Sequence, residues 1–162
     1  SELGLGYVYQ ARMILGYIYA TTHRFRLAEF EFRRILRDGF ESAKSHAALA
    51  FVLYAQGEQE EAQDELRKAL ELESDNPTAL NSLGFILAET GGDLSRALDC
   101  CRRAVKLKPA NAAYLDSLGW VYYKLGRLDR AADNLRRALE ILPGNREIAG
   151  HLKAVMEERK RA

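Results

Sequence analysis

Hydrophobic residues recur along the chain at helical spacing, three or four positions apart, which is the spacing of one face of an α-helix. Glycine and proline interrupt this pattern at regular intervals, and both residues favour turns over helix interiors. The interruptions are three glycine turns and three prolines: Gly57, Gly91-Gly92, Gly126, Pro77, Pro109 and Pro143. The pattern predicts short helices joined by tight turns, without strands.

The same segment recurs with a period of 34 or 35 residues. A leucine followed by a small residue marks each copy, at Leu15-Gly16, Leu49-Ala50, Leu83-Gly84 and Leu118-Gly119. A second small residue follows in each copy, at Ala28, Ala62, Ala97 and Ala131. Small residues at both places would let the two helices of a pair approach closely, while the leucine fills the seam between them. Such a fixed period is typical of a repeat architecture.

The fourth copy reads Leu115-x2-Leu118-Gly119-x2-Tyr122, followed by Ala131, Leu135, Ala138 and Pro143. This order resembles the tetratricopeptide repeat (TPR), a helix–turn–helix unit of about 34 residues. The third copy keeps the pattern. The second carries His46 at the first large apolar position, and the first carries Arg12 there and His23 in place of the turn glycine. The resemblance implies an all-α, right-handed superhelical solenoid of antiparallel helix pairs that serves as a non-catalytic protein-interaction module.

The repeat register predicts a lead-in at residues 1–8, repeats at 9–42, 43–76, 77–111 and 112–145, and a capping helix at 146–162. The last segment places apolar residues on one side and charge elsewhere, as a solubilising cap does. The N-terminal end has no polar cap, because Leu3, Leu5, Tyr7 and Val8 precede the first repeat. We expect it to continue into a further repeat or to pack on a partner. Self-assembly through this end, with weak homo-oligomers, is the alternative function.

Charge gives no general attraction to nucleic acid or membrane, because 24 Lys and Arg nearly balance 23 Asp and Glu. Basic pairs recur on the second helices, at Arg33-Arg34, Arg67-Lys68, Arg102-Arg103 and Arg136-Arg137. An acid precedes each pair at the favourable spacing of four: Glu29 to Arg33, Asp64 to Lys68, Asp99 to Arg103 and Asp133 to Arg137. We therefore predict a solvated face rather than a nucleic-acid site, and disfavour an RNA-binding helical repeat of the pentatricopeptide kind.

Residues 3–20 are apolar, but Arg12, Gln10 and three glycines suit a buried helix better than a membrane span. We expect a soluble protein without membrane insertion, and the sequence does not indicate its compartment. His23, His46 and His151 show no metal-ligand spacing, and Cys101 occupies a core-facing position typical of an inert thiol. The sequence predicts no catalytic residue, no metal and no cofactor.

An aromatic residue follows the small residue in every copy, at Tyr17, Phe51, Phe85 and Trp120. It lies about 100° around the helix from its small neighbour and therefore off the seam. In the TPR family first helices line the concave side, so the resemblance implies a groove that binds a peptide or helix of a partner protein. The candidate residues are Tyr17, Phe51, Tyr54, Asn81, Phe85, Asp116, Trp120 and Tyr123.

A second explanation stays open, in which the row is a duplicated packing residue that contacts only the first helix of the next repeat. The positions that clamp a terminal carboxylate in one subset of the family carry no basic residue here. They match Met13, Tyr17, Ala48, Thr78 and Ser82, or one repeat later Ala47, Phe51, Ser82, Ala113 and Ser117. An apolar segment or helix therefore fits the groove better than a carboxylate-terminal peptide.

Overall fold

The computed structural model describes residues 2–162, which form nine α-helices and, within that range, no strand. The helices are α1 Glu2–Thr21, α2 Phe25–Arg37, α3 Ala43–Ala55, α4 Gln59–Leu72, α5 Pro77–Glu89, α6 Leu94–Leu107, α7 Ala112–Lys124, α8 Leu128–Ile141 and α9 Arg146–Arg161. The all-α prediction is confirmed. The chain divides into two compact units, one ending at Ala79 and the other starting at Leu80.

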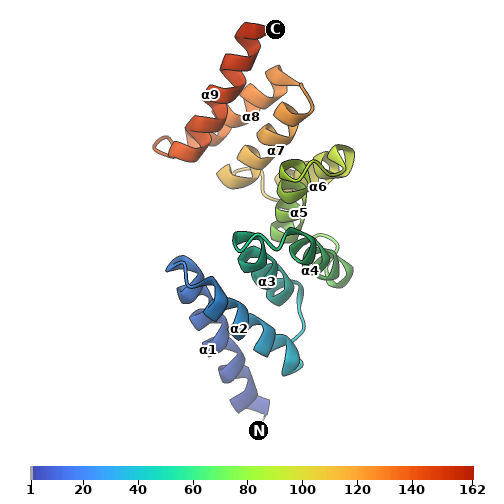
Figure 1. Cartoon of the computed structure of the whole chain (residues 1–162), viewed down its shortest axis with the longest axis vertical. Coiled ribbons are helices and arrows are strands. Elements are labelled where there is room, and N and C mark those ends of the chain that lie inside the picture. The colour runs from blue at the N-terminus through green and yellow to red at the C-terminus, as the bar shows by residue number, and fades with distance from the viewer. Residues whose placement is uncertain (1) are drawn as a thin grey trace. The chain divides into compact units, whose positions relative to one another are not determined.

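Each unit is built from antiparallel helix pairs joined by short turns (Figure 1). In the first unit α1 packs on α2, α2 on α3, and α3 on α4. In the second unit α6 packs on α7, α7 on α8, and α8 on α9, while α9 also contacts α7. The last of these contacts brings the C-terminal helix onto a first helix, where the candidate residues lie.

The first helices begin at polar caps that recur with the repeat. The side-chain oxygens of Asn111 and Asn145 each accept a hydrogen bond at 3.0 Å, from the backbone N–H of Tyr114 and of Ile148 respectively. Asn76 caps α5 and Ser42 caps α3 in the same way, at 2.9 and 3.0 Å. These caps satisfy amide groups that a helix start leaves unpaired. As a result α3, α5, α7 and α9 begin at residues 43, 77, 112 and 146, where the sequence pattern starts repeats two to four and the capping helix. The expected lead-in at residues 1–8 is part of α1 from Glu2 onward.

The small residues mark close helix contacts, as predicted. A Cβ atom on Gly119 would lie 2.7 Å from Cγ of Leu135, and one on Gly84 would lie 2.5 Å from Sγ of Cys101. A Cβ on Gly16 would meet the ring of Phe32 in the same way. Cys101 is fully buried in this contact, and burial raises the pKa of its thiol. The prediction of a packed, unreactive thiol is consistent with this environment.

Turn glycines adopt the left-handed backbone that their positions require, with φ of 85° at Gly57, 69° at Gly91 and 73° at Gly126. The first repeat has His23 at the corresponding place, and this residue also has a positive φ, 59°. A side chain with a Cβ is strained in that region. The turn geometry of the repeat therefore overrides the local preference of histidine.

Ion pairs along the second helices follow the predicted spacing in only two repeats. Arg33 pairs with Glu29 at 2.7 Å and Arg103 with Asp99 at 3.8 Å, both four residues apart. In the second repeat Lys68 makes its close ion pair with the buried Glu65, and Asp64 pairs with Arg67, although the charge of Asp64 also raises the pKa of Lys68. In the last repeat Asp133 pairs with Arg136, three residues on, rather than with Arg137. At least one member of each basic pair is therefore ion-paired with an acid on the same helix.

Candidate functional site

The first unit holds the most exposed members of the aromatic row. Phe51 on α3 is 60% exposed, although the next residues, Val52 and Leu53, are buried. Tyr54, one helical turn on, is partly exposed. Tyr17 on α1 is 41% exposed and packs its ring edge-on against Phe32, with ring centroids 5.5 Å apart. This unit therefore presents a phenyl ring to solvent on a first helix.

In the second unit the corresponding tryptophan is covered by the chain itself. The Trp120 ring stacks on His151 of α9 at a centroid distance of 4.3 Å, and on Tyr123 at 4.8 Å. Its indole N–H donates a hydrogen bond to the carboxylate of Glu89, and Nζ of Lys124 lies 5.2 Å from the ring centroid. Trp120 therefore packs on the C-terminal helix, the position that the packing explanation assigns to the first helix of a next repeat.

Asp116 is buried in the same cluster and accepts a hydrogen bond from Nδ1 of His151 at 2.7 Å. This hydrogen bond raises the pKa of His151 against the opposing effect of burial, and the charges of Asp116, Glu147 and Glu89 add to the increase. The surroundings of His151 therefore favour the protonated form of its imidazole. Sequence reasoning placed Asp116 and Trp120 in the candidate site but did not identify His151 as their partner.

The remaining candidates, Asn81 and Phe85, lie on α5 and are both partly exposed. Oδ1 of Asn81 is buried and, within the described part of the chain, lacks a hydrogen-bond partner. An unsatisfied buried acceptor lowers stability by about 1 to 3 kcal/mol, so this amide oxygen would gain from a donor. Oδ1 of Asn81 is therefore an unsatisfied acceptor on the candidate surface.

A buried charged cluster in the first unit was not anticipated. His46, 3% exposed, lies between two carboxylates, with Nδ1 2.5 Å from Glu65 and Nε2 2.9 Å from Glu41. Burial raises the pKa of Glu65, but hydrogen bonds from Lys68 and His46 outweigh it and hold that pKa below its ordinary value. The signal in the sequence was a histidine at an apolar position, together with an acid on the facing helix.

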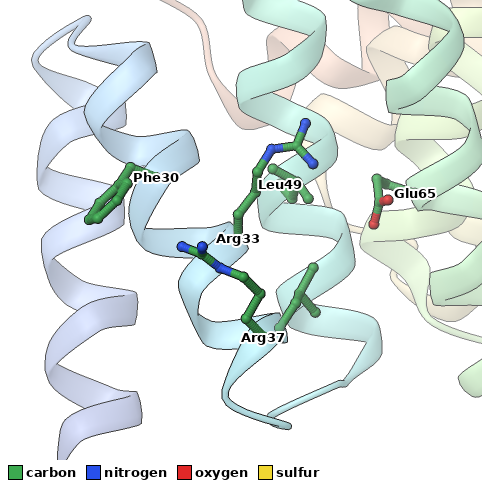
Figure 2. A pocket seen from close by; sticks show the side chains of 6 residues that line it. Phe30, Arg33, Arg37, Leu49 and Glu65 are labelled. Atoms are coloured by element: carbon green, nitrogen blue, oxygen red, sulfur yellow. The ribbon is translucent and has the colours of Figure 1, made fainter.

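A pocket of about 460 Å³ opens beside this cluster. Figure 2 shows Phe30, Arg33 and Arg37 entering from α2, Leu49 from α3 and Glu65 from α4. Arg33 is paired with both Glu29 and Glu61, at 2.7 Å each, and Glu65 is held by His46 and Lys68. The charges of Arg33 and Glu65 are therefore already paired within the chain.

Neither a metal-binding cluster nor a membrane-spanning helix is found among the described residues. No cluster of three or more His, Cys, Asp or Glu side chains there could hold a metal ion. None of the helices within residues 2–162 combines the length and hydropathy needed to cross a bilayer.

Comparison with known proteins gives the family. A TPR repeat model matches residues 50–91, and a tetratricopeptide repeat model matches residues 75–143. Among the curated proteins, none matches the sequence.

Several solved structures share the fold. The structure of pilF from Pseudomonas aeruginosa is similar over 98% of this chain and 72% of its own, with 25% identity and a TM-score of 0.82. YrrB, described as a TPR protein with an unusual peptide-binding site, matches over 90% of this chain and 74% of its own, with 25% identity and a TM-score of 0.70. TTC0263, a thermophilic TPR protein of Thermus thermophilus, at 21% identity, covers 94% of this chain and 84% of its own with a TM-score of 0.82, which shows the fold alone. Together with the repeated caps, turns and close glycine contacts, these matches establish that the chain belongs to the tetratricopeptide repeat family.

Proposed function

We propose that the protein is a non-catalytic interaction module whose first helices bind a peptide or helix of a partner protein through the aromatic row. The observation that carries the proposal is the exposure of Phe51, 60%, on a helix whose neighbouring apolar residues are buried. Exposed aromatic rings with limited side-chain freedom are the residues that most often anchor protein interfaces. Phe51 is thus the candidate anchor of the first unit, with Tyr54 beside it.

The contact between α9 and α7 supplies an example of the recognition. There a helix covers the aromatic residue of a first helix by stacking a flat side chain on it, His151 on Trp120 at 4.3 Å. The same helix also donates a hydrogen bond from Nδ1 of His151 to the adjacent acid, Asp116, at 2.7 Å. We infer that a partner segment covers Phe51 with a flat or apolar side chain in the same manner.

Other members of the row contribute unequally to this proposal. Phe85 and Asn81 remain candidates for the binding surface of the second unit, and Tyr17 for that of the first. Trp120, Tyr123 and Asp116 are already engaged with each other or with α9, so a partner reaches them only by competing with His151. The peptide-binding site described for YrrB supports peptide recognition by a similar TPR structure.

The test is a selection of binding peptides from a displayed library, followed by affinity measurements on matched variants. Phe51→Ala should weaken the selected peptides by about 2 kcal/mol or more, the loss expected for an interface anchor. Leu72→Ala is the control, because Leu72 is a similarly exposed apolar residue, 53%, on a second helix. Equal binding by the parent and Phe51→Ala would place the functional surface elsewhere.

A further inference from the structure

Four exposed apolar side chains lie along one face of α1. Leu3, Tyr7, Ile14 and Ile18, here called the α1 stripe, are 77, 71, 61 and 52% exposed. Their spacing places them on one side of the helix. Between Leu3 and Thr22 the only charged residue is Arg12, which is paired with Asp38. The exposed polar residue Gln10 also lies on this face and is uncharged. A mainly apolar face of this kind indicates an interaction surface.

A hollow of about 430 Å³ lies on this face and is lined by Leu3, Gly6, Tyr7 and Gln10. These residues stand at positions i, i+3, i+4 and i+7, the four that form a hole for one side chain of a facing helix in knobs-into-holes packing. Gly6 leaves the hole open, since a Cβ atom there would meet nothing within 4 Å. The surface is therefore shaped to receive a side chain from another helix.

The α1 stripe is symmetric about its own centre. Leu3 and Ile18 are equally distant from the midpoint between Gln10 and Ala11, and so are Tyr7 and Ile14. In an antiparallel pair of identical helices crossing at this midpoint, Ile14 of each copy falls over the hole of the other. We propose that two copies of the chain form a two-fold dimer through antiparallel α1 helices, with Ile14 of each copy seated in that hole.

The charges on the two terminal helices favour α1, rather than α9, of a second copy as the partner of the α1 stripe. The exposed face of α9 carries Arg146, Glu147, Lys153, Glu157 and Lys160. The α1 stripe offers these groups no partner, so burying them against it would leave charges desolvated and unpaired. Two α1 stripes present no such conflict. A helix of 20 residues spans about 30 Å, and one such pair buries on the order of 1,000 Å², which suits a weak, reversible dimer.

Sedimentation equilibrium from micromolar to near-millimolar concentration tests the dimer. The parent should approach twice the monomer mass, and Ile14→Lys should raise the dimer dissociation constant about tenfold or more, because it buries a charge in the hole. Lys153→Glu on α9 is the control and should leave the association unchanged. Ile14 and Lys153 are both exposed, so circular dichroism should report the parent helix content in both variants.

The double variant Tyr7→Glu/Ile14→Lys tests the direction of the helices. In the antiparallel pair each new carboxylate faces the new ammonium group of the other copy, so the double variant should dimerise more tightly than Ile14→Lys alone. In a parallel pair like charges would meet, and association would fall further. The proposal would be overturned if the parent stayed monomeric or if Ile14→Lys dimerised as tightly as the parent. It would also be overturned if the double variant dimerised more weakly than Ile14→Lys alone. Binding of the parent to phosphatidylcholine vesicles without self-association would also overturn it, in favour of a lipid surface.

Discussion

The two units differ in the side chains that fill the seam between the two helices of a pair. At the first large position of the first helix, the second unit has Leu80 and Leu115, both fully buried, whereas the first unit has Arg12 and His46. Arg12 pairs with Asp38, and the buried His46 lies between Glu65 and Glu41. The same fold therefore tolerates a polar side chain in its seam, provided that a carboxylate stands opposite.

This difference changes what each position contributes to stability. A buried leucine contributes through the area it removes from water and the cavity it fills. A buried ion pair contributes little on balance, because desolvation offsets the attraction, but removing one partner alone is costly. The second unit should thus respond to loss of volume, and the first to loss of a charge partner.

The largest effect is expected from Leu115→Ala. Loss of a fully buried leucine should lower the free energy of unfolding by about 2 to 5 kcal/mol. Arg12→Ala, the equivalent change in the first repeat, should lower it by about 1 kcal/mol at most, because the pair with Asp38 is partly exposed to solvent. Denaturant unfolding followed by circular dichroism measures both, and Trp120, the only tryptophan, reports on the second unit. Equal losses would show that the two positions are not energetically distinct.

A smaller loss is expected from Glu65→Gln. It leaves His46 buried against a neutral amide and should lower the unfolding free energy by about 1 to 3 kcal/mol. The double variant His46→Leu/Glu65→Gln gives the first unit the leucine that the second unit has at this position. It should be no less stable than Glu65→Gln alone. If the double variant lost as much unfolding free energy as His46→Leu and Glu65→Gln lose together when made singly, the two side chains would not be energetically coupled.

The same cluster predicts acid sensitivity in the first unit. The pKa of Glu65 is lowered in the folded protein, so its contribution is present above the ordinary pKa of 4.5 and is lost as the pH falls through the lowered value. The stability difference between the parent and Glu65→Gln should therefore shrink on acidification. A difference that stays constant with pH would show that the carboxylate charge has no part in it.

The turns offer a change in the opposite direction. Replacing His23 by Gly gives the first repeat the turn residue that the other three have. It removes the strain that a side chain with a Cβ atom has at this positive φ. We expect a gain of about 1 kcal/mol, seen as a rise of about 2 to 4 °C in the midpoint of thermal unfolding. Gly57→Ala, at the same place in the second repeat, should cause a loss of similar size.

The smallest effect concerns α9. Because the pKa of His151 is raised in the folded protein, its contribution is fully present below the ordinary value of 6.5 and is lost as the pH rises through the raised value. Trp120 fluorescence should change over the same interval, since protonated histidine stacks on that ring. His151→Gln should abolish the titration, and a titration that persists in this variant would assign it to another group.

Sequence reasoning identified most of the local features because each depends on residues close together in the chain. The glycine turns and the small residues of the seam recur with one period, and repetition separates them from chance. The capping signal of Ser42, Asn76, Asn111 and Asn145 was available in the same register and was not used. The candidate site was predictable only as a set of equivalent positions, and the structure gives these positions different degrees of exposure.

The sequence by itself determined the number of repeats, the turns, the inert position of Cys101 and the aromatic row, because helical spacing and a fixed period specify which residues share a face. Only the tertiary structure decided which of these faces are covered. How far Trp120 is covered depends on His151, 31 residues later, and whether a polar ring can be buried at position 46 depends on Glu65 on the facing helix. Such contacts depend on the axial offset between packed helices, which side-chain packing sets and which no local sequence pattern records.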